Sequence, residues 1–185
     1  MNLVFEVLVD QSEKPHKCSI LPLSDHPDFR IRRFSRGRPI SRMTGHFFLH
    51  PGGEDLAQCM HRDLAKGFVS SSVTNEPSDL DRKEPWVLSV IDCNWRRLPG
   101  ILQKVDHPVP RPVKIPEGFV TAYPRRNRHN LDPEEGLATI EAIFIAAAFL
   151  GRYDESLLDR YHWKKPFLEM NQNNFNRHGL AESSR

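Results

Sequence analysis

The chain has 185 residues, of which 38% are apolar, and a formal net charge of +2. This length predicts one domain with a hydrophobic core, while the small net charge gives no information on partners. Three cysteines, an odd number without metal-ligand spacing, fit a reduced, cytoplasmic protein better than a disulfide scaffold. An early acid, Glu6, argues against a secretory signal, and the longest apolar run, residues 142–150, is too short to span a membrane.

Short apolar runs between polar segments predict five strands. We expect them at residues 3–9, 46–49, 68–73, 87–91 and 119–122. An amphipathic helix is expected at 54–66, and an exposed acidic loop at 74–85. Residues 106–117 contain four prolines and are expected to be irregular.

The C-terminal third predicts helices. A long one is expected from Asp132 to Leu150, because Asp132 can cap it, Pro133 suits its first turn and Glu135 can close a capping box. Shorter helices are expected at 154–161 and 166–171, followed by a frayed polar tail from Gln172. Strands that alternate with helices predict an α/β fold.

The most informative motif is Asp92-Cys93-Asn94-Trp95, which follows the apolar strand at 87–91. The carboxyl edge of an open α/β sheet is where ligands bind. A carboxylate there can act on a proton or a positive charge, and an indole can stack on a base or face a cation. The alternative is that Asp92 caps the next helix and Trp95 fills the core, and both interpretations stay open.

Several other segments accompany this motif in a fixed order between residues 10 and 172. They are Lys17–Leu23, Leu49–Glu54, Ile91–Pro99, Thr121–Pro124, Ala138–Ala142 and Phe167–Asn171. This ordered series resembles the aminocarboxypropyltransferases of small-subunit rRNA, ribosome-biogenesis enzymes that share a superfamily with the DTW-domain enzymes of tRNA.

The resemblance implies a SPOUT-like parallel-sheet fold with a C-terminal trefoil knot, which periodicity cannot show. It implies one α/β domain over residues 1–172, with an N-terminal part to about residue 45 that carries a basic segment, a cofactor-binding part from about 46 to 172, and a polar tail at 173–185. It also implies S-adenosylmethionine as cofactor, with transfer of its 3-amino-3-carboxypropyl group to a ring nitrogen of uridine or pseudouridine.

The resemblance assigns roles residue by residue. Asp92 matches the acid that would accept the imide proton or oppose the sulfonium charge. The residues that match the cofactor pocket are Ser19, Leu49, Pro51, Trp95, Thr121, Ala122, Tyr123, Ala138 and Thr139. Two positions depart from the family, because Asn94 stands where relatives carry Ser or Thr and Tyr123 replaces an Asn. For the small residues, simple packing is the alternative.

Arginines cluster in two places and predict an RNA-binding surface, since arginine suits phosphate forks and base stacking. The candidates are Arg30, Arg32, Arg33, Arg36, Arg38, Arg125, Arg126 and Arg128. The alternative is a solvated face balanced by the acids of the chain.

We therefore expect a cytoplasmic monomer that acts on structured RNA, either small-subunit rRNA or the pre-ribosome, with no membrane contact and no metal. Nine histidines form no ligand pattern. Three other functions stay open: the same reaction on tRNA, a non-catalytic RNA-binding assembly factor, and an RNA methyltransferase.

Overall fold

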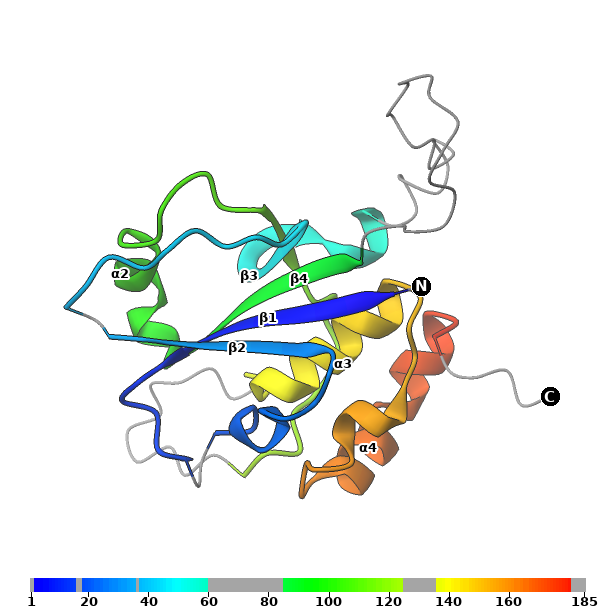
Figure 1. The fold of residues 1–185 in the computed structure, drawn as a ribbon. Helices are drawn as coiled ribbons and strands as arrows, with labels where there is room; N and C mark the ends of the chain where they lie inside the picture. The colour runs from blue at the N-terminus through cyan, green and yellow to red at the C-terminus, as the bar shows by residue number, and fades with distance from the viewer. Residues whose placement is uncertain (1, 16–17, 36, 60–84, 125–135, 181–185) are drawn as a thin grey trace, which may run out of the picture.

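The computed structural model describes residues 2–15, 18–35, 37–59, 85–124 and 136–180, and these form a parallel sheet with helices on both faces (Figure 1). The strands are β1 (Leu3–Asp10), β2 (Phe29–Phe34), β3 (Phe47–Asp55), β4 (Trp86–Asp92) and β5 (Arg111–Lys114). The α-helices are α2 (Leu98–Leu102), α3 (Thr139–Phe149) and α4 (Lys164–Arg177). Three short 3-10 turns are η2 (Leu21–Leu23), η3 (Trp95–Arg97) and η4 (Glu155–Leu158). The expected α/β class is confirmed.

The strand order is β2-β1-β4-β3-β5, and all four neighbouring pairs are parallel. All eight residues of β1 are buried, because this strand has a neighbour on each side and packed side chains on both faces. The carboxyl ends of the strands meet at one edge, where Val9 of β1 pairs with both Arg33 of β2 and Asp92 of β4.

Alternation along the strands divides the core between the two faces of the sheet. Phe5 and Val7 of β1 pack in the cluster that includes α3 and α4, whereas Leu8 packs in a second cluster with Leu98 and Ile101 of α2. Figure 1 shows α3 and α4 on one side of the sheet and α2 on the other. The sheet is therefore a middle layer between two apolar layers.

Helix α3 is buried on nearly all sides, as expected from its apolar sequence. Its Phe144 is fully buried and makes edge-to-face contacts with Phe167 and Phe175 of α4. Burial of a Phe side chain contributes about 1.5–3 kcal/mol, so this aromatic cluster is a large part of what holds α4 against α3.

The long helix begins later than expected from its capping signals. Gly136 to Ala138 are not helical, Ala138 is the extended N-cap residue, and α3 starts at Thr139. The expected start at Asp132 is thus wrong for α3, and residues 132–135 themselves lie outside the described ranges. Ala138 has no side chain that can cap, but its own backbone N–H donates to the side chain of Glu141 at 2.7 Å.

The C-terminal segment is more regular than expected. Helix α4 runs through Arg177, beyond the predicted end at 171, because Phe167, Asn171 and Phe175 recur at helical spacing and are all buried. The polar tail therefore begins later than Gln172. The helix expected at 154–161 is reduced to the 3-10 turn η4, which Asp154 caps by accepting from the N–H of Ser156.

Two expectations about strands are also wrong. Residues 119–122 form no strand, and β5 lies instead inside the Pro-rich segment 106–117. Pro112 is tolerated in β5 because β5 is an edge strand, where a missing N–H need not break the ladder. Strand β3 continues to Asp55, so the helical residues that follow start at Leu56 rather than 54. The strand expected at 68–73 and the acidic loop at 74–84 lie outside the described ranges.

A buried carboxylate, Glu6, lies within β1 and is 4% exposed. It accepts hydrogen bonds from Arg32 Nη2 at 2.8 Å, Ser89 Oγ at 2.6 Å and the N–H of Thr44 at 2.9 Å. These donors come from β2, β4 and the segment before β3. Gly45 fits against them because a Cβ there would lie 2.3 Å from Ser89 Oγ. Glu6 thus ties the segment before β3 to the sheet.

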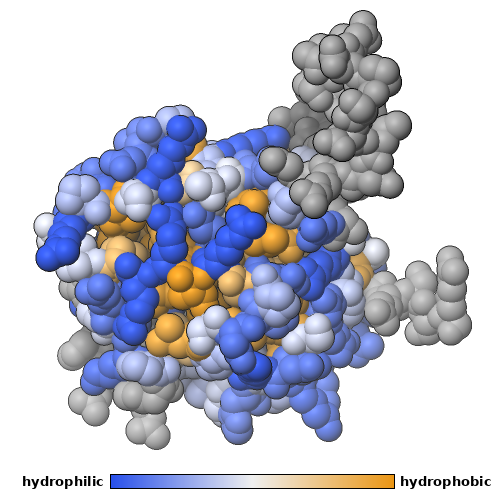
Figure 2. Space-filling model, viewed as in Figure 1, coloured by the Kyte–Doolittle hydropathy of each residue, from blue (hydrophilic) through white to orange (hydrophobic). Residues whose placement is uncertain are grey.

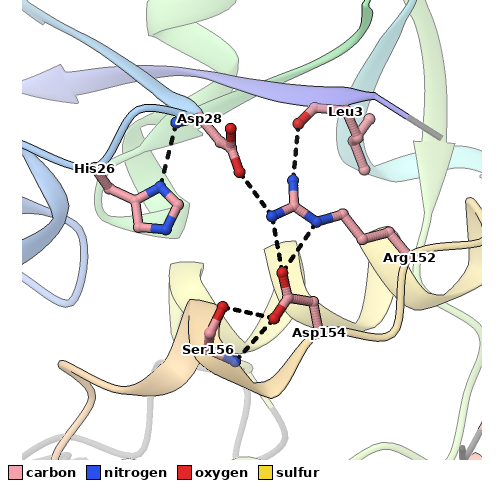
Figure 3. A network of polar contacts seen from close by, with 6 residues as sticks. All are labelled: Leu3, His26, Asp28, Arg152, Asp154 and Ser156. Atoms are coloured by element: carbon pink, nitrogen blue, oxygen red, sulfur yellow. Dashed lines mark hydrogen bonds and ion pairs between the residues drawn. The ribbon is translucent and has the colours of Figure 1, made fainter.

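A second polar network joins the amino end of the sheet to the segment after α3 (Figure 3). Arg152 donates to Asp28 Oδ2 at 2.6 Å, to the carbonyl of Leu3 at 3.0 Å and to Asp154 Oδ2 at 2.8 Å. Its guanidinium also lies 5.9 Å from the centre of the Phe5 ring. One side chain therefore links β1, the start of β2 and the cap of η4.

No helix in the described ranges is both long enough and apolar enough to cross a bilayer.

We predict that Arg152→Met lowers the free energy of unfolding by about 2–3 kcal/mol, because it leaves two carboxylates and a carbonyl without their shared donor. Urea denaturation measures this change. The matched control is Arg177→Met at the exposed end of α4, which we expect to stay within about 0.5 kcal/mol of the parent protein. Equal stabilities for the two variants would contradict the linking role of Arg152.

Candidate active site

Asp92 ends β4 at the carboxyl edge of the sheet, as the sequence predicts. Its Oδ2 accepts from the thiol of Cys18 at 3.0 Å, and its Oδ1 accepts from the hydroxyl of Thr139 at 2.6 Å. Cys18 belongs to the connection between β1 and β2, and Thr139 is the first residue of α3. One partly exposed carboxylate therefore joins three segments that are far apart in the sequence.

Asp92 does not cap the turn that follows it. The cap is Asn94, whose Oδ1 accepts from the N–H of Arg96 at 3.0 Å in η3. This contact excludes the simpler interpretation in which Asp92 is a helix cap. The backbone of Trp95 starts η3, but its side chain lies outside what the structure describes.

The donors to Asp92 among the described residues are uncharged. Burial raises the pKa of the Cys18 thiol from its ordinary value of 9.0 to about 12, and the negative charge of Asp92 and the hydrogen bond to it act in the same direction. Burial, followed by the charges of Asp92 and Asp10, also raises the pKa of Cys93 to about 12. Both groups stay protonated near neutral pH, so neither serves as a thiolate nucleophile.

Glu141 holds the rest of the site in place and is fully buried. Its Oε2 accepts from the hydroxyl of Thr121 at 2.6 Å and the N–H of Ala138 at 2.7 Å, and its Oε1 accepts from the N–H of Ala122 at 2.9 Å and the hydroxyl of Tyr161 at 2.8 Å. A buried carboxylate is stable only when such donors satisfy it. Glu141 thereby fixes the segment at 121–123 against the start of α3.

Sequence reasoning did not single out Glu141. The available signal was its position, since it is the only charged residue in the otherwise apolar helix Thr139–Phe149. A lone acid in a buried helix requires several donors, and here they come from residues up to 20 positions away in the sequence.

The structure brings most of the predicted cofactor residues together. Ser19 Oγ accepts from the N–H of Ile140 at 3.3 Å, beside the Thr139 contact to Asp92. Thr121 Oγ1 accepts from the N–H of Tyr123 at 3.0 Å, which closes the segment at 121–123. The candidates placed around Asp92 and Glu141 are Ser19, Thr121, Ala122, Tyr123, Ala138 and Thr139.

Two predicted cofactor residues lie on β3. Leu49 packs against the same core cluster as Ala122 and Tyr123, whereas Pro51 is exposed. Pro51 falls where the pairing of β3 with β5 shifts between Leu49 and Glu54. The structure thus places Leu49 with the site's apolar surroundings but records no polar contact between β3 and Asp92.

The predicted RNA-binding arginines differ in their surroundings. Arg32 is committed to the fold, because its guanidinium donates to Glu6, to Ser41 Oγ at 2.9 Å and to the carbonyl of Arg42 at 3.0 Å. Arg30, Arg33 and Arg38 are exposed. The remaining candidates lie outside the described ranges; they are Arg36, Arg125, Arg126 and Arg128.

Within the described ranges, no three His, Cys, Asp or Glu side chains are grouped as metal ligands. Neither Asp92 nor Glu141 lines the surface grooves of about 490 and 380 Å³ that the described residues form. The candidate site is therefore defined by the polar contacts of Asp92 and Glu141.

The fold and this centre define a parallel α/β protein with a carboxylate-centred site at the carboxyl edge of its sheet. No protein-family model and no curated protein matches the sequence. The structure is similar to that of the SAM-dependent rRNA:acp-transferase Tsr3 from Vulcanisaeta distributa, with a TM-score of 0.61 and 21% identity over 96% of this chain and 82% of that chain. The two proteins share a fold, and the resemblance seen in the sequence motifs is confirmed at that level.

We predict that Glu141→Gln lowers the free energy of unfolding by about 1–3 kcal/mol, because the amide nitrogen turns toward backbone and hydroxyl donors that need an acceptor. Urea denaturation tests it against Glu117→Gln, a change at an exposed position. If both variants are as stable as the parent, the four contacts of Glu141 do not hold the site.

We also predict slow alkylation of Cys18 and Cys93 at pH 8. With pKa values of about 12, these thiols should react with iodoacetamide at least about a hundredfold more slowly in the native protein than in the same protein unfolded in urea. Peptide mass spectrometry follows each site separately. Native rates that equal the unfolded rates would show that one of these thiols ionises readily.

Proposed function

We propose that this protein transfers the 3-amino-3-carboxypropyl group of S-adenosylmethionine to a ring nitrogen of uridine or pseudouridine in rRNA. The observation that carries the proposal is Asp92, a partly exposed carboxylate whose described donors, Cys18 and Thr139, are both uncharged. Its negative charge is not neutralised by either donor and can face a cation or a proton. The similar solved structure is that of an enzyme described as an SAM-dependent rRNA:acp-transferase.

The residues present fit S-adenosylmethionine. Asp92 supplies a negative charge suited to a sulfonium, and α3 is an 11-residue helix whose amino end favours a carboxylate. Leu49 and Ala122 offer apolar contacts suited to the adenine, with Ser19, Thr121, Tyr123, Ala138 and Thr139 completing the proposed pocket. Trp95 is assigned to it from the sequence motif. S-adenosylmethionine, when bound, supplies an electrophilic carbon next to its sulfonium.

The proposed work of the protein's own residues is to orient the partners and to accept one proton. Asp92 accepts the imide proton of the target base, because each carboxylate oxygen has acceptor capacity beyond the single donor it already has. Thr139 and Cys18 hold its two oxygens in a fixed direction, and neutral Cys18 does not compete for the proton. Glu141 fixes the segment at 121–123, so orientation is set before binding.

We assign RNA binding to the exposed arginines Arg30, Arg33 and Arg38, whose charges can contact phosphates. The trefoil knot, the division of the chain at residues 45 and 172, the monomeric state and the cytoplasmic location stay predictions.

The reaction is tested by its by-product. With RNA and S-adenosylmethionine, acp transfer releases methylthioadenosine, whereas methyl transfer releases S-adenosylhomocysteine. Methylthioadenosine with rRNA, and not with tRNA, is the expected result. S-adenosylhomocysteine would identify a methyltransferase, and binding of RNA with neither by-product would identify an assembly factor without catalysis.

We predict that Asp92→Asn lowers turnover by about 10²–10⁴-fold, the usual contribution of a positioned general base, while the affinity for S-adenosylmethionine stays within about tenfold. Single-turnover kinetics and calorimetry measure the two effects. Asp106→Asn, at an exposed position, is the matched control and should leave both values unchanged. Unchanged turnover in Asp92→Asn would remove Asp92 from the proposed mechanism.

A further inference from the structure

A groove of about 490 Å³ lies beside the carboxyl ends of β1 and β2, and neither Asp92 nor Glu141 lines it. Leu8, Phe34 and Ile40 lie beneath it and are 1%, 7% and 3% exposed, whereas Arg33 and Arg38 at its rim are exposed. We call it the β2 groove. Figure 2, viewed as Figure 1, shows that this face is mostly hydrophilic, with hydrophobic surface near its centre between hydrophilic side chains. The size falls in the range of small-molecule sites, about 300–1,000 Å³.

The β2 groove and Asp92 share one edge of the sheet but lie toward opposite faces. The residues beneath the groove, Leu8, Phe34 and Ile40, belong to the core cluster of α2, whereas Asp92 contacts Thr139 of α3. Val9 pairs with both Arg33 and Asp92, and neighbouring strands are about 4.8 Å apart, so the two backbones are about 10 Å apart. One RNA strand that passes over this edge of the sheet can therefore contact both β-strands.

The charges around the β2 groove are positive and are not balanced within it. No Asp or Glu occurs among the described residues that line it. Arg33 is exposed, and its contact to the carbonyl of Gln11 is 3.4 Å long, so this guanidinium has donors available for an anion. Arg32 forms a wall rather than a ligand, since its terminal nitrogens already bond to Glu6, Ser41 and Arg42.

We propose that the β2 groove binds one unpaired RNA nucleotide adjacent to the nucleotide that is modified. The base lies in the groove against Pro39 and the polar groups of Gln11 and Ser41, which are exposed, and the phosphate lies at Arg33 and Arg38. A paired base cannot enter the groove, because its faces are stacked within the duplex, whereas unpaired bases are available for such contacts. The inference rests on the proposed function and adds a requirement for single-stranded RNA beside the target.

The test compares two double variants that remove the same charge. Arg33→Ala with Arg38→Ala alters the β2 groove, and Arg30→Ala with Arg177→Ala removes two exposed arginines outside it. The affinity of each variant is measured for a short single-stranded oligoribonucleotide and for the same sequence annealed to its complement. We expect the affinity of the groove variant for the single strand to fall by about tenfold or more. The groove variant should also no longer prefer the single strand to the duplex. The control variant should weaken both RNAs alike, through lost phosphate contacts.

A second measurement does not depend on any substitution. Photo-crosslinking of a 4-thiouridine oligoribonucleotide to the wild-type protein, followed by peptide mass spectrometry, should place the crosslink on the peptide with Phe34 or the one with Ile40. Crosslinks confined to α4 or β5 would overturn the β2 groove as the subsite.

The outcomes separate this inference from the proposed function. If both double variants lose the same affinity for the single strand, the β2 groove is not a nucleotide subsite. The proposed reaction still stands in that case if wild-type protein releases methylthioadenosine with RNA. Failure of wild-type protein to bind either RNA at low salt overturns both.

Discussion

The buried carboxylate of Glu141 is the interaction on which the candidate site depends. It accepts four hydrogen bonds from Thr121, Ala122, Ala138 and Tyr161, and so brings the segment after β5, the start of α3 and the segment after η4 to one point. Because a buried charge requires its donors, separation of these segments would leave the carboxylate of Glu141 without hydrogen bonds, which is strongly unfavourable. Thr139, two residues before Glu141, is thereby placed at Asp92.

Three carboxylates near the sheet have different surroundings, and these surroundings separate structural from chemical roles. Glu6 is buried and paired with Arg32, so its charge is neutralised inside the fold. Glu141 is buried, and each of its two carboxylate oxygens accepts hydrogen bonds from two neutral donors. Asp92 is partly exposed with only one described donor on each oxygen, both neutral. Of these three, Asp92 alone combines partial exposure with remaining acceptor capacity, and we therefore propose it as the residue that takes part in the chemistry.

The sequence predicted those features that follow from local pattern. The β-branched run before Asp92 predicted β4 and the position of Asp92 at the carboxyl edge of the sheet. The apolar run after Thr139 predicted the buried part of α3. The start of α3 was misplaced because good capping residues at 132–135 outweighed the absence of any cap at Ala138. Strand β5 was missed because prolines exclude a central strand but not an edge strand. The role of Glu141 could not be predicted, since its partners are set by tertiary packing rather than by spacing.

The central claim is that the segments meeting at Asp92 and Glu141 form the binding site for S-adenosylmethionine. Hydrogen–deuterium exchange with and without S-adenosylmethionine tests it most directly, because bound ligand slows exchange of the amides it covers or stabilises. The account predicts added protection in residues 18–20, 92–97, 121–123 and 138–142, with β2 and β5 unchanged. Protection confined to the β2 groove, or no protection at saturating S-adenosylmethionine, would contradict it.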